Sequence, residues 1–508
     1  MKIAKGLRAV IINSIIFFSL KCAAQQIYHE KYRPQVHFSP KEHWINDPNG
    51  MVYYKGIYHL FFQYYPDSTV WGPMHWGHAT SKDLIHWQQQ PIALYPDSLG
   101  YIFSGSAVVD KNNTSGFGKN GRIPLVAIYT NHDPKGEKAG TKTFQNQSIA
   151  YSLDNGKTWI KYSKNPVLKN PGVTDFRDPK VMWYGPGKKW IMTLATKDRV
   201  TFYSSPDLKN WNKESEFGEK SGAHGGVWEC PDLFPLDYKG KKIWVLIVNL
   251  NPGAPNKGSG TQYFLGDFDG KNFTSNSTET KWIDYGPDDY AGITWSKTGD
   301  RKIFIGWMSN WMYANQVPTK KWRNAMTIPR ELHLAKVGEK MFVTSEPVHE
   351  LSELTKAAVD TSNVSVSKSL NISKLIGKNI TIPCRLNLNL NDIRDFNIIL
   401  SNKTGDKLII GYDKNLNQYF IDRTHAGDAA FNKEFAEKHV ASRISENRDM
   451  NISLLIDESS VELFANGGLS VMTSVFFPEK PYDRFEITTN EKVLFSKIEY
   501  MDLKSIWR

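Results

Sequence analysis

Five hairpin-like units follow one another through the first two-thirds of this chain, and they constrain its fold more than any other feature. Each unit joins two runs rich in aromatic and β-branched residues, and the clearest turns contain Gly beside Lys or Pro. Such runs predict antiparallel strands, and because helical periodicity is scarce, the sequence predicts an all-β fold. The units are 47–65, 103–110 with 122–130, 177–196, 229–250, and 290–295 with 301–309.

A second repeat is offset from these hairpins. Its copies share the form Ser-x-Asp, a turn and then Trp, at 81–87, 152–159 and 205–211, with a weaker copy at 266–273. Asp in such a position accepts hydrogen bonds from backbone groups just after it, which is turn chemistry. Irregular spacing is typical of a propeller whose loops vary in length. The two repeats together predict a five-bladed β-propeller over residues 25–340.

The pattern changes from about Lys336 onward. Residues 341–352 read as a linker with a possible short helical piece. Short alternating segments separated by turn signals then fill 353–508, which predicts a C-terminal β-sandwich. No comparably rich acidic motif occurs there, which favours a structural role for this region.

Three short motifs place one acid each just ahead of a strand-like run. They are WINDPNG at 44–50, FRDP at 176–179 and WECPD at 228–232, with the acids Asp47, Asp178 and Glu229. The first strand of each propeller sheet lines the central axis, so equivalent positions at its mouth converge. We expect the three acids to occupy equivalent positions and to share one pocket. The alternative is that they are ordinary turn acids on the surface.

The N-terminal segment resembles an export signal. Three basic residues precede the apolar stretch 9–20, and small residues follow up to Ala24. We therefore expect residues 1–24 to be a signal peptide, cleaved after Ala24, and the protein to be periplasmic or extracellular. The apolar stretch is too short for a stable membrane span, so no integral membrane segment is expected after cleavage. Lipid attachment at Cys22 is the alternative, although Lys21 argues against it.

Composition narrows the remaining classes. The 508 residues are enough for two domains, and the formal net charge of +11 is spread without a basic stripe, which disfavours nucleic-acid binding. After cleavage only Cys230 and Cys384 remain, too far apart in sequence to suggest a disulfide framework. His75, His78 and His224 could be metal ligands, but loop or hydrogen-bonding roles are the simpler interpretation. We expect no metal and no cofactor. The oligomeric state is left open.

Several of these segments, taken in order, resemble glycoside hydrolase family 32, which contains invertases, inulinases and levanases. They are WINDPNG, FSGS, FRDP, WECPD and the stretch 306–332, together with 420–427 and 456–468 near the C-terminus. The resemblance covers nearly the whole mature chain. It implies a five-bladed β-propeller followed by a β-sandwich, which agrees with the count made from the repeats.

The resemblance also implies roles for single residues. Asp47 matches the nucleophile, Glu229 the general acid/base and Asp178 the acid that stabilises the transition state. The positions that usually line the fructose pocket are matched by Asn46, Gln63, Trp71, Phe103, Ser104, Arg177 and Trp311.

Four local interpretations accompany these roles. Trp311 is the match for one aromatic contact, and Trp307 is the alternative. Arg177 need not pair with Asp178, because neighbours on a strand face opposite ways; it could steady another acid or contact a hydroxyl. Backbone N–H groups of the Asn-Gly turn could donate hydrogen bonds to the Asp47 carboxylate. Cys230 is expected to be a small buried neighbour of the general acid/base rather than a nucleophile.

The implied activity is that of a retaining glycoside hydrolase that releases terminal β-D-fructofuranosyl units from levan, inulin and sucrose. Two carboxyl groups, about 5–5.5 Å apart in such enzymes, act as nucleophile and as acid/base. An invertase or a fructosyltransferase would use the same three acids. A non-catalytic fructan-binding protein is the alternative from another class, and the complete acid trio argues against it. The segment 307–319 resembles inulinases and levanases more than sucrose-specific invertases.

Overall fold

The computed structural model describes residues 28–275 and 277–507, and strands dominate it. This confirms the predicted all-β class. The described helical segments are α1 (Pro134–Lys138), α2 (Ile372–Ile376) and the 3-10 helix η1 (His349–Leu354). None of the helices in the described ranges is long and apolar enough to cross a membrane. The predicted signal peptide and Cys22 lie outside the described residues.

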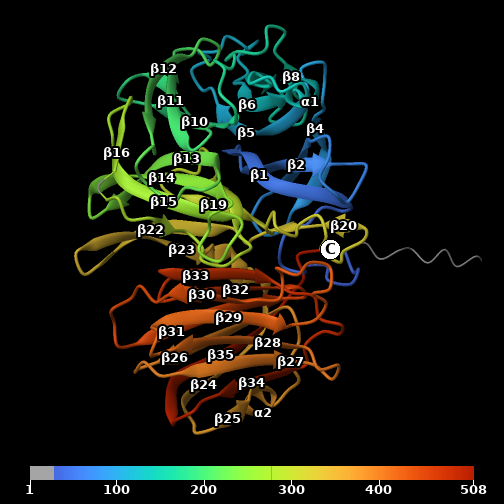
Figure 1. Ribbon diagram of the computed structural model, residues 1–508, viewed down its shortest axis with the longest axis vertical. Coiled ribbons are helices and arrows are strands. Elements are labelled where there is room, and N and C mark those ends of the chain that lie inside the picture. The colour runs from blue at the N-terminus through green and yellow to red at the C-terminus, as the bar shows by residue number, and fades with distance from the viewer. Residues whose placement is uncertain (1–27, 276, 508) are drawn as a thin grey trace, which may run out of the picture.

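Two bodies make up the molecule: an upper one coloured blue to yellow and a lower one coloured orange to red (Figure 1). The upper body contains five sheets of four or five strands, in chain order. Their strands are β1 (His43–Tyr54), β2 (Ile57–Tyr65), β3 (His75–Ser81), β4 (Gln88–Leu94) and β20 (Trp322–Arg323); β5 (Tyr101–Val109), β6 (Leu125–His132), β7 (Gln145–Ser152) and β8 (Ile160–Lys161); β9 (Phe176–Tyr184), β10 (Lys189–Thr196), β11 (Arg199–Ser205) and β12 (Asn212–Phe217); β13 (Val227–Tyr238), β14 (Lys241–Asn251), β15 (Gly260–Phe268), β16 (Phe273–Ser275) and β17 (Lys281–Trp282); and β18 (Tyr290–Thr294), β19 (Ile303–Met308), β21 (Ala325–Met326), β22 (Arg330–Val337) and β23 (Lys340–Pro347).

Each predicted hairpin unit forms the first two strands of one sheet. The turn between β1 and β2 consists of Lys55 and Gly56, and that between β13 and β14 of Lys239 and Gly240. All four residues have positive φ. Two-residue hairpin turns of this type match the right-handed twist of the strands they join, so these dipeptides fix the register of both hairpins.

The Ser-x-Asp repeat marks the links between the third and fourth strands. Asp83 accepts hydrogen bonds from the backbone N–H groups of Ile85 and His86, at 3.0 and 2.8 Å. Asp154 and Asp207 bind the backbone after them in the same way. The predicted turn chemistry is therefore confirmed.

Apolar clusters join each sheet to the next. Trp76 of the first sheet packs in one cluster with Tyr129 of the second. Further clusters join the second sheet to the third, the third to the fourth and the fourth to the fifth. The last cluster brings Ile305 of the fifth sheet against Phe62 of the first. The first strands β1, β5, β9, β13 and β18 also contact one another in this cyclic order.

The lower body is a β-sandwich of two six-stranded sheets around one apolar core. Its strands are β24 (Thr355–Val366), β35 (Val493–Leu503), β26 (Cys384–Leu390), β31 (Met450–Asp457), β32 (Ser460–Ala465) and β33 (Ser470–Val475) in one sheet, and β25 (Ser369–Asn371), β34 (Arg484–Thr488), β27 (Phe396–Ser401), β28 (Lys407–Asp413), β29 (Gln418–His425) and β30 (Lys438–Ser442) in the other. The segment 341–352 was expected to be a linker with a possible short helical piece; the helical piece is present, but most of the rest is a strand. This strand is β23, which pairs with β22, and η1 follows.

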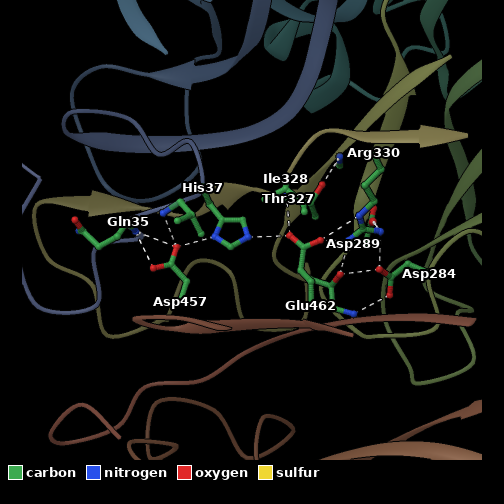
Figure 2. Close-up of polar contacts among 12 residues, drawn as sticks. Gln35, His37, Asp284, Asp289, Thr327, Ile328, Arg330, Asp457 and Glu462 are labelled. Atoms are coloured by element: carbon green, nitrogen blue, oxygen red, sulfur yellow. Dashed lines mark hydrogen bonds and ion pairs between the residues drawn. The ribbon is translucent and has the colours of Figure 1, made fainter. Parts of the chain in front are cut away.

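A buried polar network lies where the two bodies meet (Figure 2). Arg330 of the fifth sheet binds Glu462 of the sandwich at 2.6 Å, and Asp284 and Asp289 at 2.9 Å each. His37 lies between Asp457 and Glu462, at 2.7 and 2.8 Å. All of these side chains are fully buried. The network fixes the position of the sandwich relative to the sheets that carry the candidate site.

Candidate active site

All ten residues singled out from the sequence line one cavity of about 270 Å³. They are Asn46, Asp47, Gln63, Trp71, Phe103, Ser104, Arg177, Asp178, Glu229 and Trp311. The acids come from the first strands of three different sheets. The expectation of one shared pocket is therefore met by the geometry.

Each first strand carries a register irregularity near the cavity. The pairing shifts after Asn46 in β1, after Ile102 in β5, after Arg177 in β9, after Glu229 in β13 and after Tyr290 in β18. Extra residues of this kind are left unpaired, bend the strand and re-aim the side chains. Five such bulges allow consecutive residues of one strand to reach the same cavity.

The three acids do not occupy equivalent positions, contrary to the expectation from the motifs. Asp178 lies inside the β9 bulge, whereas Glu229 is the last regularly paired residue before the β13 bulge. The counterpart of Asp178 in β13 is Cys230, and both have positive φ, at 65° and 40°. Glu229 corresponds instead to Arg177. Alignment on the shared Pro of the motifs would have revealed this offset of one residue.

Asp47 is held by side chains rather than by the turn that follows it. Asn46 Nδ2 donates to one carboxylate oxygen at 2.8 Å, and Ser104 Oγ donates to the other at 2.7 Å. Burial, followed by the nearby Glu229 carboxylate, raises the pKa of Asp47, and the two donors oppose this rise. The expected backbone donors of the Asn-Gly turn do not fulfil this role, because the bulge aims the carboxylate into the cavity.

Asp178 is 5% exposed and has fewer donors. Its Oδ2 accepts from the backbone N–H of Cys230 at 3.0 Å. Burial raises the pKa of Asp178 to about 7; Arg177 opposes the rise, and Glu229 and Asp47 add to it. The Cys230 thiol lies 3.6 Å from Oδ2 of both Asp47 and Asp178. Burial, followed by these charges, raises the pKa of the thiol, so Cys230 is a neutral spacer between two acids.

Both carboxylate oxygens of Glu229 accept hydrogen bonds. Arg177 donates from Nε and Nη2 to Oε1, at 3.1 and 3.0 Å, and the Tyr290 hydroxyl donates to Oε2. Arg177 also binds Asp175, at 2.5 Å. The guanidinium therefore steadies Glu229. This is one of the two roles that the sequence suggested for Arg177, namely steadying an acid other than Asp178.

The aromatic residues separate into structural and cavity-lining groups. Trp307 is fully buried, and its indole N–H donates to the Ile45 carbonyl at 3.1 Å. Trp311 instead lines the cavity, packed against Trp307 with ring centroids 4.9 Å apart. Of the two, Trp311 is therefore the one that lines the cavity. Trp71 stands at the mouth, 38% exposed, with its ring edge-on to Phe103.

Sequence reasoning missed several groups at the site. His132, Glu137, Gln145 and Asp175 also line the cavity. Asp175 lies two residues before Arg177, so its proximity to the FRDP motif was a usable signal. Tyr290, which binds Glu229, occupies in the fifth unit the position of Glu229 in the fourth. No comparable signal marks His132 and Glu137, which lie at the end of β6 and in the loop after it.

The histidines considered as metal ligands have other contacts. His78 is buried against His59 at 3.0 Å, His75 Nδ1 lies 2.9 Å from the Pro73 carbonyl, and His224 stacks on Trp228. Within the described part of the chain, no group of three or more His, Cys, Asp or Glu side chains is arranged to hold a metal ion.

Several known proteins are similar to this chain in sequence and in structure. The levanase of Bacillus subtilis is 45% identical over 502 residues, which cover 96% of this chain and 73% of that protein. The extracellular exo-inulinase of Aspergillus niger is 40% identical over 488 residues, covering 89% and 90%. The crystal structure of exo-inulinase from Aspergillus awamori superposes with a TM-score of 0.86 at 36% identity, covering 94% of this chain and all of that one. Residues 37–346 match the N-terminal domain of glycosyl hydrolases family 32 and residues 350–502 match its C-terminal domain; the chain belongs to glycosyl hydrolase family 32.

Proposed function

We propose that this protein is a retaining β-fructofuranosidase that releases terminal fructosyl units from fructans and from sucrose. The observation that carries the proposal is the cavity in which Asp47, Asp178 and Glu229 meet. Relatives named levanase, exo-inulinase and, at 35% identity, invertase of Schizosaccharomyces pombe support the substrate class.

Asp47 is proposed as the nucleophile. Its carboxylate attacks C2 of the fructosyl unit, and the bond from C2 to the leaving oxygen breaks, so that a covalent fructosyl-enzyme forms. Asn46 and Ser104 hold the two oxygens and aim the carboxylate at C2. The same donors stabilise its ionised form against the cost of burial.

Glu229 is proposed as the general acid/base. It gives its proton to the departing oxygen in the first step and takes a proton from the attacking water in the second. Arg177 and Tyr290 orient its carboxyl group from opposite sides. Water then restores the Asp47 carboxylate and releases fructose.

Asp178 is proposed to hold fructose hydroxyls and so stabilise the transition state. Among the described residues, only the backbone N–H and the thiol of Cys230 contact Asp178 Oδ2, so the sugar would be its second partner in the cavity. The remaining pocket residues would bind and orient the ring: Asn46, Gln63, Trp71, Phe103, Ser104, Arg177 and Trp311. Gln63 Nε2 is buried without a hydrogen-bond partner in the described structure, which suits a donor reserved for a sugar hydroxyl.

The fold that supports this site is proposed to be a five-bladed β-propeller over 25–340, with the sandwich over 353–508. The cyclic packing of five sheets and the pairing of β20 with β1 support closure of the ring. Export after removal of residues 1–24 is proposed in addition. The extracellular relatives among the exo-inulinases support it.

The test is the product profile on inulin, levan and sucrose, compared with those of Asp47→Ala and Glu229→Ala. Release of fructose from the two polymers without intermediate oligomers is expected, together with loss of at least about a thousandfold in kcat for both variants at unchanged melting temperature. A ladder of oligomers would indicate endo-cleavage, and new trisaccharides from sucrose would indicate transfer. Fructan binding by the wild type without any cleavage would show a binding protein instead.

A further inference from the structure

One wall of the cavity has no role in the mechanism above. His132 and Gln145 face each other across the β6–β7 pairing, and Glu137 lies on α1 in the loop between these strands. Both His132 and Glu137 line the cavity with the proposed catalytic acids. A buried imidazole and a carboxylate at this place call for an explanation.

His132 is fixed in position and in tautomer. It is 3% exposed, and its ring stacks on Phe103 with centroids 4.2 Å apart. The Gln145 side-chain amide lies 3.3 Å from Nδ1. An amide N–H can only donate, so Nδ1 accepts, and in the neutral ring Nε2 carries the proton. Nε2 therefore donates to Glu137 Oε2, at 3.1 Å.

Glu137 is exposed at the cavity mouth, yet the buried His132 binds one of its oxygens. Its side chain is 56% exposed, and α1 is capped by Asp133, which accepts from the Lys135 N–H. Among the described residues, no donor contacts its second carboxylate oxygen, Oε1. The result is an acceptor with one oxygen bound to His132 and the other without a donor in the described structure.

The burial of the cavity-lining residues indicates which part of a substrate Glu137 contacts. Asp178 and Gln63 are almost fully buried, so the fructosyl ring that reacts occupies the floor. Trp71 and Glu137 also line the cavity but are exposed, so the part that departs lies near them at the mouth. A departing sugar carries hydroxyl groups, and carboxylates are strong acceptors for these.

We propose that Glu137, positioned by His132, binds hydroxyls of the sugar unit that leaves and thereby sets which fructans are cut efficiently. The inference rests on the proposed β-fructosidase function. It assigns the β6–β7 loop as a specificity element on the leaving-group side, distinct from the residues that hold the reacting ring.

The test compares two substrates with the same fructosyl group. The leaving group of an inulin-type trisaccharide is a sugar, whereas the leaving group of an aryl β-D-fructofuranoside carries no sugar hydroxyls. For Glu137→Ala, kcat/KM for the trisaccharide should fall about tenfold, at least five times more than for the aryl substrate, mainly through KM. Lys138→Ala on the same helix is the matched control, and both its rates should stay within about twofold of the wild type.

His132 acts through Glu137, so its variant has a distinct signature. In the double variant His132→Ala/Glu137→Ala, kcat/KM for the trisaccharide should fall no further than in Glu137→Ala alone, because the two residues act as one unit. Equal losses on both substrates, or no loss on either, would overturn the inference while leaving the proposed function standing. Failure of the wild type to cleave either substrate would overturn the proposed function itself, and the inference with it.

Discussion

Asp47 and Asp178 lie on either side of the same thiol, yet their surroundings suit different tasks. Asp47 has two side-chain donors, one on each oxygen. Asp178 has a backbone donor and is almost fully buried, and burial raises its pKa to about 7. A carboxylate that must attack carbon needs both of its oxygens directed, whereas one that waits for sugar hydroxyls can remain short of donors until substrate arrives.

The raised pKa of Asp178 has a consequence for stability. A carboxyl group whose folded pKa lies above the ordinary 3.8 binds more protons in the folded than in the unfolded chain. Stability therefore falls as pH rises from about 4 to about 7 and stays reduced above that. Replacement of the acid by an amide of the same size removes this penalty.

Asp178→Asn should accordingly gain stability relative to the wild type at pH 8 but not at pH 4. The expected difference in the free energy of unfolding at pH 8 exceeds about 1 kcal/mol. Urea unfolding at the two pH values measures it, and exposed Asp300→Asn serves as the control. A stability difference that does not vary with pH would contradict the assignment. Activity should be lost in the same variant.

The elements that could be predicted from sequence are those encoded by local chemistry. The positive-φ dipeptides Lys55-Gly56 and Lys239-Gly240 form tight turns wherever they connect strands, and the Ser-x-Asp copies close their own turns. The five hairpins were therefore recognisable, and β23 was missed because its mixed polar sequence resembles a linker. It is a strand only because β22 lies beside it.

The candidate site was foreseen at the level of motifs but not of contacts. The ten expected residues share the cavity. The donors of Asp47, the partner of Glu229 at Tyr290 and the wall at His132 depend on bulges and on neighbouring sheets far away in sequence. The shared Pro of the motifs records the offset of one residue between Asp178 and Glu229, but no local pattern records which side chains from other sheets these acids meet.

The Ser-x-Asp turn offers a test at the scale of one element. Asp207 accepts from the backbone N–H groups of Lys209 and Asn210, at 2.9 and 2.8 Å, between β11 and β12. Asp207→Ala leaves both without this acceptor, so the free energy of unfolding should fall by about 1–2 kcal/mol. Calorimetry measures the change, and Asp300→Ala, in an exposed turn, should stay within about 0.5 kcal/mol of the wild type. Equal stability of both variants would mean that the repeat does not stabilise its turn.

On the scale of the whole molecule, the sandwich is joined to the catalytic body by buried charges rather than by a loose linker (Figure 2). Glu462 accepts from His37, from Nε and Nη2 of the Arg330 guanidinium and from the Ile328 backbone N–H. Loss of one partner in such a network leaves other charges buried and unpaired, which is costly. The two bodies should therefore unfold together.

His37 provides the test of this coupling. Burial opposes its charge, but the hydrogen bonds and charges of Asp457 and Glu462 prevail and raise the pKa of His37 to about 9. A histidine whose folded pKa exceeds the ordinary 6.5 adds stability that is fully present below pH 6.5 and is lost as pH rises through about 9. His37→Gln should thus cost about 3 kcal/mol at pH 6 and much less at pH 9.5.

Urea unfolding of both proteins, followed by tryptophan fluorescence and by circular dichroism, measures this prediction. Every Trp except Trp507 lies within the first 322 residues, so fluorescence reports on the body that carries the site, whereas circular dichroism reports on both. Coincident transitions in the wild type are expected, because the buried network ties both bodies into one cooperative unit. Two separate wild-type transitions would show that the sandwich is an independent appendage. A cost of His37→Gln that is the same at pH 6 and pH 9.5 would show that the charge of His37 does not hold the bodies together.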